Sequence, residues 1–192
     1  MNNIAIFASG SGTNAENMVR YFNQSDTIRI KVVLSNNPNA FVLERMGKLN
    51  IPAVVFNADQ LNGGKVLEWL NSYGIDYIVL AGFLKLIPLN IIRTFPNRIV
   101  NIHPALLPKH GGKGMYGMRV HEAVIAEGDT ESGITVHLVN ERYDEGSIIF
   151  QTQCPVLPSD TPQTLADRIH QLEYQHYPRV VQRFIEGRQP DF

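Results

Sequence analysis

The chain has 192 residues, 44% of them hydrophobic and 18% charged, and its 17 basic and 18 acidic residues leave a net charge of -1. This composition is typical of a globular protein that buries a core, and the lack of a Lys/Arg cluster argues against a nucleic-acid interface. The single cysteine, Cys154, excludes an internal disulfide and indicates a reducing compartment.

The apolar segments are too short for a membrane span or a signal sequence. The first of them, residues 4–8, has no basic region before it. No apolar stretch approaches the roughly 18 residues of a membrane helix. A cytoplasmic protein without a membrane partner is therefore expected.

Over the first hundred residues, short apolar runs alternate with segments of helical period. Continuous apolar strands separated by helices indicate a parallel sheet covered on both faces. The predicted fold class is α/β, with a Rossmann-like, mostly parallel sheet. The expected strands are 4–8, 30–34, 53–56, 77–80 and 98–102, and the expected helices are 14–22, 40–49 and one that includes residues 66–70.

After His103 the pattern changes to a loop rich in proline and glycine, residues 104–117. A helix is expected at 119–126, then a hairpin of strands 134–139 and 147–153, and a long final helix over 162–185. Pro178 should kink or interrupt that helix. With no repeat or linker, one domain over 1–192 is predicted, with an N-terminal half of about 1–100 and a C-terminal half of about 101–192.

The segment "SGSGTNA", residues 9–15, joins the first expected strand to its helix. Glycines allow close approach of a ligand, and a helix N-terminus favours an anion such as a phosphate monoester. The letters also satisfy the G-x-G-x-x-A dinucleotide pattern. However, residues 35–37 are "SNN", without the acid that would hold a ribose. A third alternative is a tight turn in which Thr13 or Asn14 caps the helix.

Asn101 and His103 stand where the fifth apolar run ends. Ligands collect at the carboxyl ends of parallel strands, and residues two apart share a face of the sheet. An amide beside an imidazole can stabilise an oxyanion, and the imidazole can also transfer a proton. The alternative is a capping asparagine and a loop histidine held by local backbone bonds.

Asp144 lies in the expected turn of the hairpin. A carboxylate near His103 would stabilise the imidazolium, raise the pKa of His103 and fix the ring. Aspartate before a Glu-Gly pair is also common in turns that have no catalytic role. Spacing alone leaves open whether Asn101, His103 and Asp144 meet.

Three segments, "NIHPALLPK", "GITVHLVNERYDEGSIIFQ" and "EYQHYPRVVQRF", closely resemble the phosphoribosylglycinamide formyltransferase family. The resemblance covers nearly the whole chain and implies the formyltransferase fold. It implies a purine-biosynthesis enzyme that moves the formyl group of 10-formyltetrahydrofolate, a co-substrate, to the amino group of glycinamide ribonucleotide. The N-terminal half would then bind phosphate, and the C-terminal half would hold the catalytic and folate sites.

The same resemblance implies roles for individual residues. Asn101, protonated His103 and Asp144 form the catalytic trio, in which Asp144 keeps His103 charged and helps to relay a proton. No metal and no covalent enzyme intermediate is needed. Gly12, Thr13 and Asn14 would bind the substrate phosphate, and His170 and Glu173 its amine and ribose, whereas without the resemblance a solvated helix carboxylate is favoured for Glu173.

The folate pocket is implied by two further segments. Its apolar side chains and backbone amides suit a flat pterin, and Lys85 stands where family members often have arginine. Thr135 and His137 share a strand and are expected to contact the residues that bind the substrate, and the alternative for His137 is a partly buried strand histidine without such a role. The implied folate-binding residues are Leu84, Lys85, Leu86 and Ile87, together with Asn101, Asn140, Glu141, Arg142, Tyr143 and Asp144.

Residues 111–117 depart from the best-known family members in their glycine pattern and are expected to form a mobile cover. His110 and His121, on either side of this segment, could contact the substrate, but the favoured interpretation is that they are surface or helix-face histidines.

Proteins with other functions share parts of these motifs. A methionyl-tRNA formyltransferase should carry a further C-terminal tRNA-binding domain, and a 10-formyltetrahydrofolate deformylase an N-terminal regulatory one. A non-catalytic sugar-phosphate module would not need the trio, and an NAD oxidoreductase would need the missing acid. The expected partners are small-molecule substrates, without nucleic acid, and the chain is expected to be a monomer or homodimer.

Overall fold

The computed structural model describes residues 1–188, which divide into two compact units, Met1–Val100 and the chain from Asn101 onward. Strands alternate with helices, and the pairings between β1, β2, β3 and β4 are parallel. The predicted α/β class with a mostly parallel sheet is confirmed.

The strands of the first unit lie in the order β3-β2-β1-β4. β1 lies between β2 and β4, so neither edge of the strand is open, and Ile4, Ala5, Ile6 and Phe7, which alternate between its two faces, are all fully buried. This double coverage explains why the strand appears in the sequence as a continuous apolar run rather than an alternating one. The bounds are β1 Asn2–Phe7, β2 Ile28–Ser35, β3 Ala53–Val55 and β4 Tyr77–Leu80.

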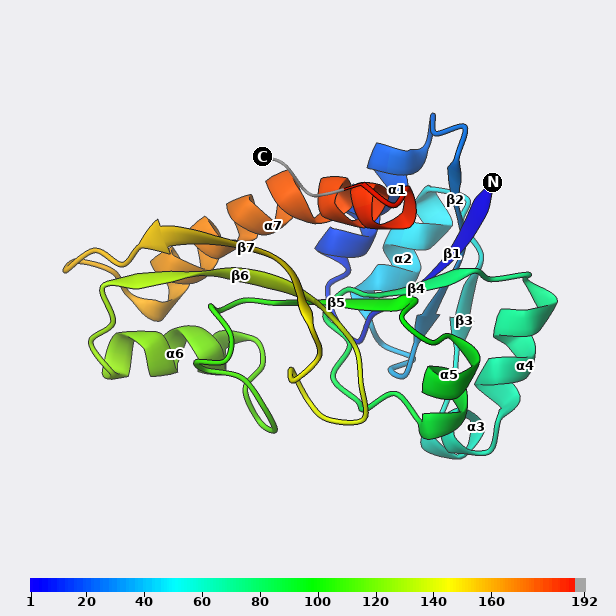
Figure 1. The fold of residues 1–192 in the computed structure, drawn as a ribbon, viewed down its shortest axis with the longest axis horizontal. Helices are drawn as coiled ribbons and strands as arrows, with labels where there is room; N and C mark the ends of the chain where they lie inside the picture. Colours follow the sequence, from blue (N-terminus) through cyan, green and yellow to red (C-terminus); the bar gives the residue numbers. More distant parts are fainter. Residues whose placement is uncertain (189–192) are drawn as a thin grey trace. The chain divides into compact units, whose positions relative to one another are not determined.

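Helices cover this part of the sheet (Figure 1). The strand order reverses at β1, and because crossover connections are right-handed, α1 and α2 fall on one face while the β3–β4 connection with α4 falls on the other. The short helices α3 and α5 were not expected. The bounds are α1 Thr13–Phe22, α2 Phe41–Lys48, α3 Ala58–Asn62, α4 Lys65–Ser72 and α5 Leu89–Thr94.

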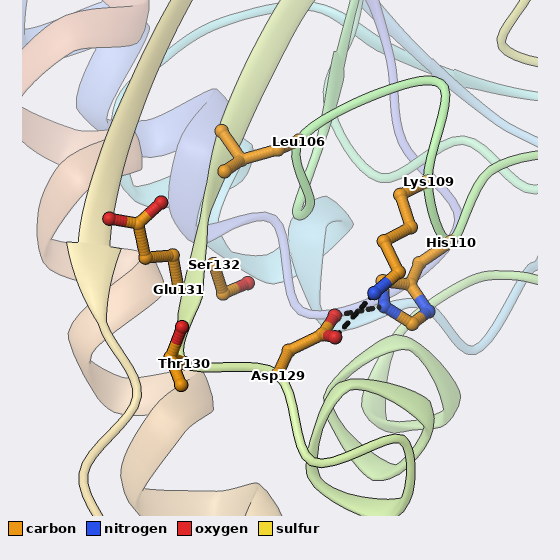
Figure 2. A pocket seen from close by; sticks show the side chains of 7 residues that line it. All are labelled: Leu106, Lys109, His110, Asp129, Thr130, Glu131 and Ser132. Atoms are coloured by element: carbon orange, nitrogen blue, oxygen red, sulfur yellow. Dashed lines mark hydrogen bonds and ion pairs between the residues drawn. The ribbon is translucent and has the colours of Figure 1, made fainter.

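The second unit carries the predicted hairpin, in which β6 and β7 pair antiparallel. α7 packs along both strands and also against α6 (Figure 1). The loop that follows β5 meets the turn before β6 where Lys109 and His110 contact Asp129 (Figure 2). The bounds are β5 Ile99–His103, α6 Met118–Ala126, β6 Glu131–Leu138, β7 Ile148–Pro155 and α7 Pro162–Ile185.

α7 continues past Pro178, so the predicted interruption does not occur. The helix begins at a capping box formed by Thr161 and Thr164, with proline at its first turn. Tyr177 and Val181 are fully buried on the apolar face around Pro178. Burial of this face outweighs the backbone hydrogen bond that the proline removes. No helix within residues 1–188 is long and apolar enough to cross a bilayer.

Candidate active site

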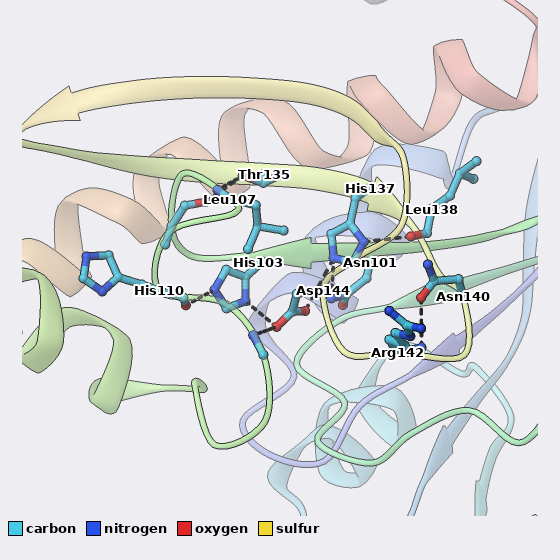
Figure 3. Close-up of polar contacts among 12 residues, drawn as sticks. Asn101, His103, Leu107, His110, Thr135, His137, Leu138, Asn140, Arg142 and Asp144 are labelled. Carbon is cyan, nitrogen blue, oxygen red and sulfur yellow. Dashed lines mark hydrogen bonds and ion pairs between the residues drawn. The ribbon is translucent and has the colours of Figure 1, made fainter.

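The end of β5 presents Asn101 and His103 on one side of the strand. Ile102 between them is 7% exposed and His103 is 3% exposed, so both faces of the strand end are covered. Figure 3 shows the Asn101 and His103 side chains beside His137 and Asp144. The three groups that the sequence singled out thus meet within the second unit.

Asp144 bridges two histidines. Its Oδ2 lies 3.6 Å from His103 Nδ1, and its Oδ1 lies 3.6 Å from His137 Nε2. The backbone N–H of Gly112 also donates to Oδ2, at 2.9 Å. Asp144 itself has a left-handed backbone with φ 58°. The turn needs glycine at position 146, because a Cβ there would overlap the carbonyl oxygen of Leu138.

Burial, rather than the neighbouring carboxylate, decides the charge of His103. Desolvation lowers the pKa of His103, and the opposing effects of Asp144 and of the bond to the His110 carbonyl do not offset it. The expectation that the pKa would be raised is therefore wrong in its net direction. Ring Nε2 donates to the carbonyl oxygen of His110 at 2.7 Å, which requires a proton on that nitrogen.

The pKa of Asp144 is lowered, although this carboxyl is largely buried. Burial by itself would raise this pKa, but the combined effects of His137, His103 and the Gly112 N–H leave it lowered. Asp144 is therefore ionised at neutral pH, and its charge faces both imidazole rings.

His137 sets the orientation of the Asn101 amide. Its Nδ1 lies 2.8 Å from the carbonyl oxygen of Leu138, so this nitrogen carries the proton and, in the neutral ring, Nε2 is an acceptor. Asn101 Nδ2 donates to that Nε2 at 3.1 Å. One amide hydrogen is thereby used, and the second has no partner among residues 1–188 and is available to a ligand.

Thr135 holds the loop that follows β5. Its buried hydroxyl donates to the Ala105 carbonyl at 2.7 Å and accepts the Leu107 N–H at 3.0 Å. Gln151 Nε2 donates to the same hydroxyl oxygen of Thr135 at 2.8 Å. These three bonds join the loop to β6 and β7 and so support the backbone immediately beyond His103.

A second histidine–carboxylate pair lies on α7. His170 Nδ1 is 2.9 Å from Glu173 Oε2, and this bond is the main cause of the raised pKa of His170. Glu173 is only 5% exposed, which is inconsistent with a solvated helix carboxylate.

Neither His110 nor His121 lies on the surface, so a surface position is wrong for both, although His121 is a helix-face histidine as expected. His121 is 2% exposed, and burial, followed by the nearby His170, lowers its pKa to about 4. The His110 side chain is 4% exposed, and its Nε2 lies 2.7 Å from Asp129 Oδ2. For His121 the sequence did hold a signal, since Val120, His121 and Val124 share the buried face of α6.

Comparison with known proteins places the chain in a family. A family model described as formyl transferase matches residues 2–181, which is most of the chain. The chain belongs to the formyl transferase family. It is 40% identical over 192 residues to the chloroplastic phosphoribosylglycinamide formyltransferase of Arabidopsis thaliana, covering 96% of this chain and 66% of the relative. It is 36% identical to the phosphoribosylglycinamide formyltransferase of Haemophilus influenzae, with 98% of this chain and 89% of the relative covered.

The solved structures agree with this assignment. The crystal structure of glycinamide ribonucleotide transformylase 1 from Symbiobacterium toebii matches with a TM-score of 0.89 at 34% identity, over 97% of this chain and 89% of the other. The predicted formyltransferase fold is confirmed. The chain spans 66% of the length of the Arabidopsis relative and 61% of the chloroplastic relative from Vigna unguiculata.

The first unit of this member of the family contains the glycine loop. Gly12 precedes α1 with φ 74°, and a Cβ there would overlap the Val42 side chain, so only glycine fits. Ser9 ties the loop to the segment after β4, because its hydroxyl donates to Asn36 Oδ1 at 2.7 Å and accepts the Leu84 N–H at 3.0 Å. The predicted phosphate residues thus begin α1, where the first N–H groups have no partner within the helix.

The two segments expected to bind folate differ in how firmly they are held. In the first unit, Leu84 and Leu86 are 45% and 42% exposed while Ile87 is buried at 4%, so the core holds one end of the segment and leaves two apolar side chains open. In the second unit, Asn140 Oδ1 accepts the Arg142 N–H at 2.9 Å. This is a local turn bond rather than a core contact.

The arrangement around Asn101 suits acyl chemistry. An amide hydrogen, an imidazole and an ionised carboxylate converge without a nucleophilic serine or cysteine among them. The one cysteine, Cys154, is buried, and burial raises the pKa of its thiol, which makes it a poor nucleophile.

Proposed function

We propose that the protein transfers the formyl group of 10-formyltetrahydrofolate to the amino group of glycinamide ribonucleotide, a reaction of purine biosynthesis. The products are formylglycinamide ribonucleotide and tetrahydrofolate. Membership of the formyl transferase family and the names of the relatives support this substrate pair. The observation that carries the proposal is the convergence of Asn101, His103 and Asp144.

The chemistry proceeds through addition and elimination. The substrate amine attacks the formyl carbon, a C–N bond forms, and the carbonyl electron pair moves to oxygen. The second hydrogen of Asn101 Nδ2 stabilises that oxyanion, and a single such donor is worth about 2.7–4 kcal/mol in comparable sites. The Nε2–H of His103 adds a second donor when it turns from the His110 carbonyl to the substrate oxygen. The bond from the carbon to the folate nitrogen then breaks, and the oxygen regains its double bond.

One proton must leave the attacking amine, and one must reach the departing folate nitrogen. His103 is suited to carry it, because a ring held between the Asp144 carboxylate and the His110 carbonyl is oriented for transfer at a fixed position. Asp144 balances the positive charge while the ring holds the proton. His137 acts through Asn101 as a positioning residue, and Thr135 through the loop backbone.

Substrate binding is assigned to the remaining residues. Gly12, Thr13 and Asn14 at the start of α1 hold the phosphate, which a helix N-terminus favours. Glu173, paired with His170, holds the amine and ribose end. The exposed Leu84 and Leu86, with residues 140–144, contact the folate.

A direct assay tests the proposal. The protein is mixed with 10-formyltetrahydrofolate, and formation of tetrahydrofolate is followed with and without glycinamide ribonucleotide. The proposal requires release that depends on the ribonucleotide. Release without any acceptor would identify a deformylase, and release only with charged initiator tRNA would identify the tRNA enzyme. No turnover with any acceptor, together with retained ribonucleotide binding, would leave a binding module.

A further inference from the structure

A second group of polar side chains lies beyond His110, on the side away from the catalytic ring. It consists of His110, Glu127 and Asp129, which we call the His110 cluster. One potential ligand atom from each residue lies within 4.8 Å of the others. His110 Nε2 is 2.7 Å from Asp129 Oδ2, and His110 Nδ1 is 3.9 Å from Glu127 Oε1. A loop residue thus meets two acids from the end of α6.

A cavity of about 240 Å³ opens beside the cluster (Figure 2). At roughly 30 Å³ for each molecule it has room for several waters. Only one of the side chains that line it is large and apolar. The lining residues are Leu106, Lys109, His110, Asp129, Thr130, Glu131 and Ser132.

Ser132 contributes a buried polar group to the lining of this cavity. The residue is 2% exposed, and its hydroxyl has no hydrogen-bond partner among residues 1–188. Figure 2 shows this hydroxyl directed toward the side of the cavity where Asp129 lies. A buried hydroxyl without a partner costs about 1–3 kcal/mol. A water or ligand in the cavity removes that cost.

We propose that the His110 cluster binds a divalent cation, and that Zn²⁺ is the ion that fits it best. One imidazole nitrogen and two carboxylate oxygens provide three ligands of the kind zinc prefers, and water completes the tetrahedron. The Ser132 hydroxyl hydrogen-bonds to a metal-bound water. Mg²⁺ fits less well, because it prefers oxygen ligands in an octahedron.

The ammonium group of Lys109 lies where a metal ion would contact the two carboxylates of the cluster. Its ammonium contacts Asp129 Oδ1 and lies 3.6 Å from Glu127 Oε2. The Lys109 side chain is 55% exposed on a flexible stem, so it can leave for solvent. Zinc and the ammonium therefore compete for the same two carboxylates. Removing the ammonium should tighten metal binding.

The choice of variant follows from the backbone of His110. With φ 53° the residue turns its ring toward Asp129 while its carbonyl accepts the hydrogen bond from His103. Replacing His110 would disturb the catalytic ring as well as the cluster. Asp129→Asn and Lys109→Gln change the cluster alone, and both keep side chains of similar size.

Calorimetric titration of the metal-free protein with ZnCl2, without substrate, tests the site. Wild type should bind one Zn²⁺ more tightly than Mg²⁺. Asp129→Asn should weaken zinc binding at least about tenfold, because a ligand and a charge are lost. Lys109→Gln should tighten it by about threefold or more, because the competing ammonium is gone. Glu122→Gln, on the exposed face of α6, is the matched control and should bind as wild type does.

The site is overturned if wild type binds no zinc or if Asp129→Asn binds it as tightly as wild type. Equal affinities of Lys109→Gln and wild type would also overturn it, and so would Mg²⁺ binding as tight as Zn²⁺ binding. Circular dichroism shows whether each variant is folded, and Lys109→Gln keeps the test decisive should Asp129→Asn fail to fold. Because no substrate is present, the result is independent of the proposed formyl transfer.

Discussion

Two histidine–carboxylate pairs in the second unit have opposite electrostatic outcomes. His103 faces Asp144 at 3.6 Å and its pKa is lowered, whereas His170 faces Glu173 at 2.9 Å and its pKa is raised. The first ring is 4% exposed and the second 46%. Burial outweighs the longer contact in the first pair, and the close hydrogen bond outweighs burial in the second.

The comparison shows that a carboxylate neighbour does not by itself make a histidine cationic. In the buried pair the carboxylate only partly compensates the desolvation of the ring, so the neutral form of His103 is favoured at rest and Asp144 balances the charge when the ring takes up a proton. In the half-exposed pair the hydrogen bond to Glu173 raises the pKa of His170 and so favours the protonated ring. The first arrangement suits transient proton transfer, and the second suits steady binding of a polar ligand.

Among the predicted effects, the largest should be the loss of activity when the carboxylate of the buried pair is removed. Asp144→Asn leaves an oxygen for the Gly112 N–H but loses the charge that balances a protonated His103. We expect kcat to fall by about 100-fold or more, which is the usual contribution of a proton-transfer group. The measurement is the formyl-transfer assay at saturating substrates.

Glu145→Gln is the control for that variant. Glu145 lies next in the same turn, but its side chain is 55% exposed and, within residues 1–188, forms its ion pair with the exposed Arg142. Its kcat should stay within about twofold of wild type. An Asp144→Asn rate as high as that of the control would contradict the role of Asp144.

The buried His121 extends the comparison to a ring with no hydrogen bond at its buried Nδ1 among residues 1–188. Its pKa is about 4 in the folded protein, against 6.5 as the ordinary value. Between these values the unfolded chain binds a proton that the folded chain does not, so stability falls as the pH drops from 6.5 to 4. The loss has an upper limit of about 3 kcal/mol.

Urea unfolding of wild type and His121→Gln across this pH range measures that loss. His103 and His176, whose pKa values are also lowered, contribute in the same direction to both proteins. The difference between the two slopes therefore isolates His121. Parallel slopes would show that His121 takes up its proton equally in both states.

Removing the carboxylate of the half-exposed pair should have a smaller effect. Glu173→Gln loses the bond that chiefly raises the pKa of His170, so this pKa should fall in an NMR titration. If the pair holds the substrate amine, KM for glycinamide ribonucleotide should rise about tenfold with little change in kcat. Asp167→Asn, a weaker influence one turn earlier, should shift His170 less. An equal shift in both variants would contradict the assigned cause.

The smallest effect, on the free energy of unfolding, is expected for an ion pair on the protein surface. Lys65 and Glu68 on α4 are 2.7 Å apart, but their side chains are 52% and 67% exposed. Lys65→Ala should change the free energy of unfolding by less than about 0.5 kcal/mol, as measured by urea denaturation. A loss of 2 kcal/mol or more, about the effect of a buried contact, would show that exposure is the wrong criterion for ranking these pairs.

Much of the architecture could be predicted from the sequence, because strands and long helices are marked by patterns of neighbouring residues. Apolar runs marked β1, β2, β4 and β5, and helical spacing marked α7. The short helices α3 and α5 were missed, since five or six residues are too few to show a period. A capping signal for α3 was present, because Asn57 and Gln60 form a capping box.

In the site, too, some features follow from the local sequence and others only from the tertiary structure. The sequence by itself determined that an amide and an imidazole would share one face at a strand end and that a carboxylate would stand in a turn, because strand period and turn chemistry depend on neighbouring residues. Only the tertiary structure decided that His103 would be buried against the His110 carbonyl, that Gly112 would hold Asp144, and that His121 would lie inside. Desolvation depends on everything that surrounds a group, and those surroundings come from segments far apart in the chain.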